Sequence, residues 1–225
     1  MSTADEGEAR ERQLRIANAL KLWGECFPAP GTIVERYLQS RGLRGPIPRS
    51  LRMHGMLRHR ESGGSRPAMV ALVDHVEHGP VGVHLTYLAI DGSMQATVEP
   101  RKRFLGPIGG GAVRLARVDP DRELVIAEGI ETTASVMLAT GLPGWAALSA
   151  VGLRTLVLPP EARKVVIAAD NDANRTGEKA AHAAAQRWLT EGRRVRIATP
   201  PAPGTDFNDA LIGRGHVGEA RDVAA

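Results

Sequence analysis

Three acidic residues at the ends of two apolar segments are the first candidates for chemistry in this sequence. Glu128 follows the apolar run 124–127 and precedes a glycine, whereas Asp170 and Asp172 follow the run 164–169. Both runs are short, rich in β-branched residues and almost unbroken by polar residues, which is typical of strands buried on both faces of a parallel sheet. Ligands gather beyond the carboxyl ends of such strands, so we expect the three carboxylates to lie together at one edge of a sheet.

Such a cluster of carboxylates predicts a bound cation. Neighbouring carboxylates repel each other and raise each other's pKa unless a cation neutralises them. Mg²⁺, a hard ion that prefers oxygen ligands, is the simplest occupant. Because Asp170 and Asp172 are two residues apart, an extended backbone directs both side chains the same way. Two alternatives need no metal: Glu128 is a strand-end acid bonded to a neighbouring helix N-terminus, and Asp172 caps the helix that follows it.

The order of these elements resembles the Toprim domain, which DnaG-type primases, topoisomerases and some nucleases share. A strand ending in Glu-Gly is followed by a helix, a strand ending in Asp-x-Asp and a second helix. The segments after Glu128 and Asp172 are most similar to the Toprim domains of phage- and plasmid-type primases. The resemblance implies an α/β fold with a parallel sheet flanked by helices, and Mg²⁺ or Mn²⁺ as cofactor. It also implies Glu128 as general base or acid, with Asp170 and Asp172 as metal ligands.

Other acidic residues join the predicted site only through this resemblance. Asp206-Phe-Asn-Asp209 resembles an element that adds acids to the metal cluster of primase-type Toprim domains, so we expect Asp206 to be a ligand and leave Asp209 open. The alternative is a helix start, with Asp206 as N-cap and Asp209 three residues on. Many primases carry an acid four residues after the glutamate. Here that position is Thr132, and the acid Glu131 falls one residue earlier. Either Glu131 reaches the second metal from a shifted turn, or that metal site is weaker.

The rest of the chain must position these residues, and its pattern predicts two parts. A disordered tail (1–10) precedes a smaller basic α+β subdomain (11–118), and the Toprim domain occupies 119–225. In the basic subdomain the pattern predicts helices over 11–23 and 33–41, a basic loop over 51–66, and strands over 69–73 and 81–88. In the Toprim part it predicts further strands over 145–148 and 195–198 and helices over 131–140, 150–157 and 176–190.

Positive charge is concentrated before the predicted Toprim domain. Residues 41–117 contain 12 basic and 5 acidic residues, a net charge of +7. Within this stretch Arg101, Lys102 and Arg103 precede Phe104, a pattern that can contact phosphates and stack a base. The alternative is a solvated turn. Residues 103–106 also resemble the Lys-aromatic-Leu-Asn element of DnaG-type primases, which implies contact with template or nucleotide.

Composition removes several functional classes. The single cysteine, Cys26, forms neither an internal disulfide nor a multi-cysteine zinc site, and the seven histidines show no metal-ligand spacing, so we expect no zinc. The sequence contains no P-loop motif. It shows neither a signal peptide nor an apolar run near the roughly 20 residues of a membrane span, so we expect a cytoplasmic protein with no membrane partner.

The leading hypothesis is a primase-like nucleotidyl transferase of phage or plasmid type that makes or extends primers on single-stranded DNA in DNA replication. Its expected partners are single-stranded DNA, NTPs and, because the sequence contains no cysteine-rich zinc module or fused helicase, a separate helicase or zinc-bearing template-recognition protein. A metal-dependent nuclease is the first alternative, since the same carboxylates can activate water. A nucleic-acid-binding module without turnover is the second.

Overall fold

The computed structural model describes residues 3–171, 176–200, 202, 204–213 and 220–223. The chain divides into two compact units. Unit 1 comprises residues 1–40 and 46–108, and unit 2 comprises residues 41–45 and 109–225. In the described part of the chain, no helix has the length and apolar character needed to cross a membrane.

Unit 1 is built on an antiparallel sheet in the order β1-β2-β3-β4-β5. Helix α1 packs on one face of this sheet, where Ala19, Leu22 and Trp23 meet Val70 and Leu85. The predicted hairpin in this region is present, as β3 and β4. The elements of unit 1 are α1 (Thr3–Gly24), β1 (Phe27–Pro28), α2 (Ile33–Ser40), β2 (Leu51–Arg58), β3 (Ser65–His75), β4 (Gly79–Tyr87) and β5 (Lys102–Leu105).

Two predictions for unit 1 were wrong. Helix α1 begins at Thr3, so most of the predicted disordered tail is helical. Residues 5–11 are exposed and lack an apolar face, but glutamate, alanine and arginine have high helix propensity. The predicted basic loop over 51–66 contains strand β2, which pairs with β3. One side of an antiparallel sheet can face water, so the arginines and histidine of this strand are compatible with its conformation.

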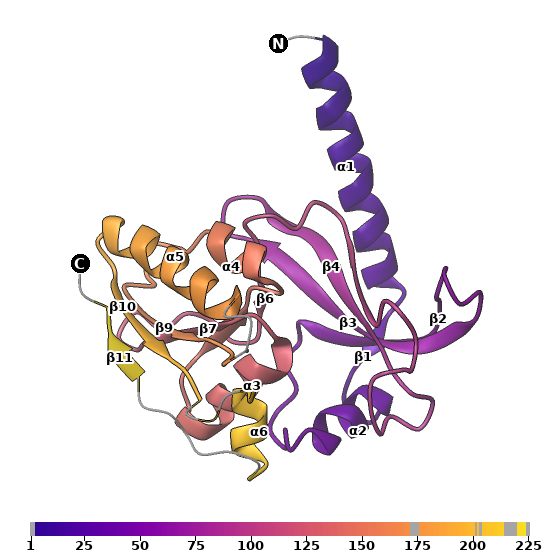
Figure 1. Ribbon diagram of the computed structural model, residues 1–225. Helices are drawn as coiled ribbons and strands as arrows, with labels where there is room; N and C mark the ends of the chain where they lie inside the picture. Colours follow the sequence, from indigo (N-terminus) through magenta and orange to yellow (C-terminus); the bar gives the residue numbers. More distant parts are fainter. Residues whose placement is uncertain (1–2, 172–175, 201, 203, 214–219, 224–225) are drawn as a thin grey trace. The chain divides into compact units, whose positions relative to one another are not determined.

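Unit 2 contains a sheet in the order β11-β10-β9-β7-β8-β6. The four central strands are parallel, and the two edge strands pair antiparallel to their neighbours. Helices α4 and α5 cover one face, and α3 and α6 the other (Figure 1). The elements of unit 2 are β6 (Val113–Arg114), β7 (Leu124–Ala127), α3 (Ile130–Thr140), β8 (Gly144–Ala146), α4 (Ala150–Thr155), β9 (Lys164–Ala168), α5 (Thr176–Thr190), β10 (Arg194–Ala198), α6 (Phe207–Leu211) and β11 (Ala220–Asp222).

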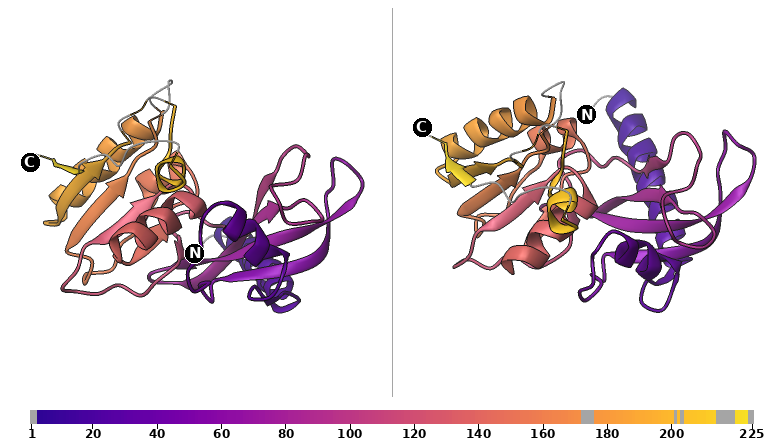
Figure 2. Two further views of the ribbon diagram at one scale, coloured as in Figure 1. Left: turned by 90° about the horizontal axis from the view of Figure 1, so that it is seen from below. Right: turned by 60° about the horizontal axis from the view of Figure 1, so that its bottom comes forward.

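The core of unit 2 follows from the composition of its strands. Alternate residues of β7 and β9, including Val125 and Val166, pack with Phe207 of α6 on one face. Helix α5 lies along the sheet in both views of Figure 2, and it buries Ala180, Ala184 and Trp188. This architecture confirms the predicted fold class: a parallel sheet flanked by helices, preceded by a smaller α+β part.

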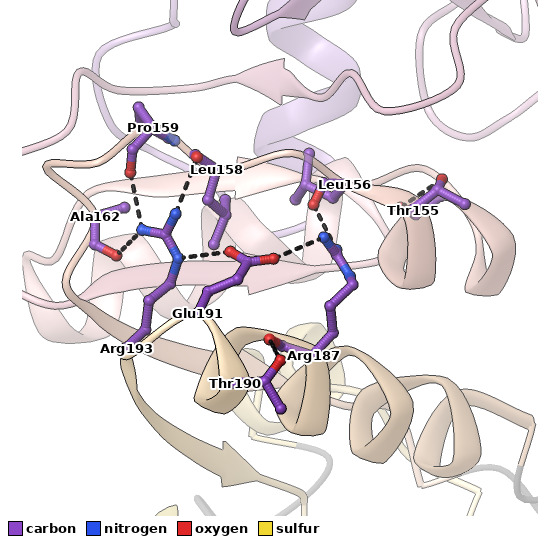
Figure 3. A network of polar contacts seen from close by, with 10 residues as sticks. Thr155, Leu156, Leu158, Pro159, Ala162, Arg187, Thr190, Glu191 and Arg193 are labelled. Carbon is purple, nitrogen blue, oxygen red and sulfur yellow. Dashed lines mark hydrogen bonds and ion pairs between the residues drawn. The ribbon is translucent and has the colours of Figure 1, made fainter.

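A network of arginines anchors the carboxyl end of α5 to the segment before β9 (Figure 3). The Arg187 guanidinium donates to the Leu156 carbonyl at 2.6 Å, and Glu191 forms ion pairs with both Arg187 and Arg193. Arg193 also donates to the backbone carbonyls of Leu158, Pro159 and Ala162, at 3.0, 2.9 and 2.7 Å. These backbone carbonyls find their hydrogen-bond partners here, so the carboxyl end of α5 is held against the segment before β9.

Candidate active site at the carboxyl edge of the parallel sheet

The structure places Glu128 and Asp170 at the same edge of the unit 2 sheet. Strands β7 and β9 are parallel neighbours, and Ala127 is paired with Ala168. Glu128 lies one residue beyond this pair and Asp170 two residues beyond it, so both follow the carboxyl ends of adjacent strands. Asp172, the third acid of the predicted cluster, lies outside the described residues.

The first turn of α5 lies against this edge through a glycine. A Cβ atom added at Gly177 would lie 3.3 Å from Oε1 of Glu128 and 3.6 Å from the backbone oxygen of Asp170. The Glu128 carboxylate is therefore close to a helix N-terminus, whose partial positive charge favours an anion. This is the environment expected from the non-metal alternative for Glu128, and it leaves the carboxylate at the edge of the sheet beyond which ligands of parallel sheets gather. The prediction missed Gly177, although a glycine in the first turn of a predicted helix was a signal of close approach.

The end of β9 is tied to the segment that leads into α6. The Asn171 side-chain amide donates to the Pro200 carbonyl at 2.8 Å, and the Asn171 backbone N–H donates to the Thr205 carbonyl at 3.3 Å. In return the Gly204 N–H donates to the Asn171 carbonyl at 2.7 Å. These bonds bring the residue before Asp206 beside the residue after Asp170, so the start of α6 belongs to the same edge of the sheet.

Asp206 and Asp209 form a capping box at the start of α6. The Asp206 Oδ1 accepts a hydrogen bond from the Asp209 N–H at 2.8 Å, and the Asp209 Oδ2 accepts one from the Asp206 N–H at 3.3 Å. The helix-start alternative is therefore present in the structure. An ionised carboxylate offers about four lone-pair sites on two oxygens, so capping through Oδ1 does not exhaust the capacity of Asp206.

Glu131 and Asn208 lie on the two helices that cover the same face of the sheet. Glu131 is buried in the first turn of α3 and is 7% exposed. Asn208 is fully buried, and its amide donates to the Ser135 Oγ at 2.9 Å and to the Arg41 carbonyl at 2.7 Å. Ser135 in turn donates to the Glu131 carbonyl at 2.8 Å, so α6 is linked to the turn that carries Glu131. The prediction treated Asn208 only as a spacer between two acids.

Comparison with known protein families agrees with this arrangement. Residues 123–216 match the Toprim domain family. This part of the chain is a Toprim domain. Residues 13–115 match a second family, a domain of unknown function called DUF7146. No curated protein sequence matches the chain significantly.

Solved primase structures share the fold at low sequence identity. A DnaG primase catalytic domain bound to ssDNA has a TM-score of 0.56 at 16% identity and covers 92% of this chain and 77% of its own. The Aquifex aeolicus primase, with zinc binding and RNA polymerase domains, has a TM-score of 0.53 at 15% identity, with coverages of 82% and 53%. The primase fragment of the bacteriophage T7 primase-helicase has a TM-score of 0.51 at 17% identity, with coverages of 80% and 65%. The chain thus spans less than two thirds of the last two structures, and the likeness establishes the fold alone.

The residues at the edge of the Toprim domain fit a hard divalent cation. Toprim domains generally bind Mg²⁺ through acidic residues, and here Glu128 and Asp170 follow adjacent strands, while Asp206 begins the helix that backbone bonds tie to the end of β9. Carboxylate oxygens are the ligands that Mg²⁺ prefers. The chemistry of the donor set therefore matches the ion that the domain implies.

In unit 1, the three consecutive cations do not form one surface. In β5, Arg103 is paired with Leu85 and Lys102 with Thr86 of β4, so their side chains point to opposite faces of the sheet. Arg101 forms an ion pair with Glu99 at 3.1 Å, and Arg103 forms one with Glu61. The turn predicted as the alternative is a strand instead. Arg103 lines a cleft of about 530 Å³ on unit 1 together with Arg58, Arg60 and Phe104.

One group of possible metal ligands lies elsewhere in unit 1. Among the described residues, ligand atoms of His75, Glu77 and His78 all lie within 4.8 Å of one another. The prediction that the histidines show no metal-ligand spacing was therefore wrong for this segment. The His-x-Glu-His spacing was visible in the sequence, but only the hairpin brings the three side chains together.

Proposed function

We propose that this protein is a primase-like nucleotidyl transferase that uses Mg²⁺ or Mn²⁺ to make or extend short primers on single-stranded DNA. The observation that carries the proposal is the convergence of Glu128 and Asp170 at the carboxyl edge of a Toprim domain, in a chain whose fold is shared by primases. The relative with the same fold over 92% of this chain is a catalytic domain bound to ssDNA, which supports single-stranded DNA as a partner.

The acidic residues at the carboxyl edge of the sheet would have two different roles. Glu128 would act as general base or acid for the 3′-hydroxyl that attacks the α-phosphate of an incoming NTP. Asp170, Asp172, Asp206 and Glu131 would hold the metal. When bound, Mg²⁺ would neutralise the triphosphate and stabilise the attacking and leaving oxygens. The first turn of α5, with Gly177 against Glu128, would keep the base in place.

The N-terminal part would bind the nucleic acid. Arg103 would contact phosphates of template or nucleotide from the cleft that it shares with two further arginines. Lys102 would contact phosphates from the opposite face of the sheet, and Arg101 from the residue before the strand. In this proposal residues 11–118 are the DNA-binding subdomain and 119–225 the Toprim domain. Site selection would depend on a separate helicase or zinc-bearing protein, in phage or plasmid DNA replication in the cytoplasm.

A product-length assay tests the proposal. Purified protein is incubated with single-stranded DNA, labelled NTPs and Mg²⁺ or Mn²⁺, and the products are resolved by length. We expect new oligonucleotides, and their loss in Asp170→Asn. The control Asp121→Asn removes an exposed acid before the amino end of β7, and it should leave synthesis unchanged. Shortened DNA without new oligonucleotides would identify a nuclease instead. DNA binding without either product would favour a binding module and refute an autonomous primase.

A further inference from the structure

The hairpin between β3 and β4 of unit 1 gathers two histidines and a glutamate. His75 is paired with Gly79 at the ends of the two strands, so the connecting loop is only residues 76–78. Gly79 has φ +67°, which fits a short hairpin loop that ends in a left-handed residue. This tight turn places Glu77 and His78 beside the His75 ring, at the tip of the hairpin.

The two imidazole rings lie close together at the tip of the hairpin. The rings of His75 and His78 are stacked, with centroids 4.5 Å apart and an interplanar angle of 15°. Each ring can offer one nitrogen as a metal ligand, and the ligand atoms of both lie within 4.8 Å of a carboxylate oxygen of Glu77. His75 is 7% exposed and held in the sheet, whereas Glu77 and His78 are exposed.

One hydrogen bond fixes the tautomer of His75. The Glu77 backbone N–H donates to the His75 Nδ1 at 3.1 Å. Nδ1 therefore carries the lone pair, and that lone pair faces the loop that bears the other two side chains. A metal ion would take the place of this N–H as the partner of Nδ1, and the ring would keep its proton on Nε2, as metal-bound histidines commonly do.

We propose that this hairpin binds one divalent transition-metal ion through His75 Nδ1, the Glu77 carboxylate and a ring nitrogen of His78. Two imidazoles and one carboxylate favour Zn²⁺, Co²⁺ or Ni²⁺ over Mg²⁺, and three protein ligands leave a position for water or for a ligand from a partner. One ion can lie in the plane of both rings only if the stacked rings rotate away from their interplanar angle of 15°, so binding requires a side-chain movement. The two exposed side chains on the loop would make that movement, while the buried His75 stays in place.

This site would be separate from the Toprim edge in both position and chemistry. The Toprim carboxylates offer oxygen ligands alone, whereas the hairpin offers two imidazole nitrogens. Because Mg²⁺ prefers oxygen ligands, it should not compete for the hairpin. A hairpin whose His75 only caps the turn would have the same hydrogen bond but no affinity for metal. Metal binding and its dependence on Glu77 and His78 therefore distinguish the two roles.

The test is a Co²⁺ titration of the full chain without a polyhistidine tag, in excess Mg²⁺, followed by visible absorption and by calorimetry with Zn²⁺. We expect one ion per chain and visible absorption bands typical of Co²⁺ with a low coordination number. Glu77→Gln and His78→Asn change exposed loop residues, so the fold should persist, and each should weaken binding at least roughly ten-fold. His182→Asn, which removes an exposed histidine of α5, should bind as the natural protein does. Absence of Co²⁺ binding, or equal affinity in Glu77→Gln, His78→Asn and His182→Asn, would overturn the proposal.

Discussion

The contact between Gly177 and Glu128 gives a substitution that should separate activity from stability. In Gly177→Ala the new methyl group would lie 3.3 Å from the Glu128 Oε1, a few tenths of an ångström closer than an ordinary van der Waals contact. Gly177 does not have a positive φ, so alanine fits the helical backbone. Alanine is favoured over glycine in a helix interior by up to about 1 kcal/mol, which offsets the cost of the tight contact. We therefore expect the free energy of unfolding to stay unchanged or to rise slightly.

Activity should respond in the opposite direction. The methyl group must displace the Glu128 carboxylate by a few tenths of an ångström, and a misplacement of about 1 Å can cost about 10²-fold in rate. Scaled to the smaller shift, primer synthesis should fall by roughly three- to ten-fold. Gly177→Val carries a larger, β-branched side chain and should reduce synthesis further. The measurements are initial rates of oligonucleotide synthesis and urea unfolding on the same preparations.

Gly7→Ala is the matched control. Gly7 also lies within a helix, α1, and nothing lies within 4 Å of a Cβ added there. This variant should gain similar stability and keep full activity. If Gly177→Ala also retained full activity, the position of the Glu128 carboxylate would not matter for synthesis, and the role proposed for Glu128 would be refuted.

Three further predictions concern single side chains. Asp206→Asn should keep the α6 cap, because asparagine caps as well as aspartate, but should lose metal-dependent synthesis; unchanged synthesis would make Asp206 a cap alone. Asn208→Ala leaves a partly buried carbonyl and a buried hydroxyl without their donor, so urea unfolding should show a loss of about 2–4 kcal/mol. Burial raises the pKa of the Cys26 thiol from 9.0 to about 11. The folded state therefore favours the neutral thiol, and the resulting stabilisation is complete below pH 9 and is lost as the pH rises through about 11. Cys26→Ala should flatten this fall, as measured by urea unfolding across that range.

The parallel sheet was predictable because its strands are buried on both faces. An apolar run that stops at an acidic residue predicts both a buried strand and the position of its carboxyl end. The carboxyl ends of neighbouring parallel strands lie at the same edge of the sheet. Glu128 and Asp170 were placed correctly at one edge by this reasoning alone. Helix α5 was likewise predicted with its observed bounds, because its apolar positions recur at helical spacing up to the glycine that ends it.

Sequence reasoning was weaker where polar residues occur in regular structure. Strand β2 contains Leu51, Met53 and Leu57 at alternate positions, but the density of charge over 51–66 and the two glycines at 63 and 64 favoured a loop. The run of cations at 101–103 was treated as one patch, whereas a strand directs neighbouring residues to opposite faces. In both cases the alternation of side chains along a strand was a better guide to the structure than the density of charge.

The position of the proposed base depends on residues that no motif contains. Gly177 sets how close the first turn of α5 comes to Glu128, while Arg193 holds the other end of the same helix through three backbone carbonyls. The bonds of Arg187 and Arg193 hold the carboxyl end of α5, and the absence of a side chain at Gly177 lets its first turn come close to the strand edge. The acids can be recognised from their place at strand ends, but their spacing is set by α5, α6 and the bonds of Asn171 and Asn208. The geometry of the proposed site is thus a property of the sheet of unit 2 and its helices, and no single motif encodes it.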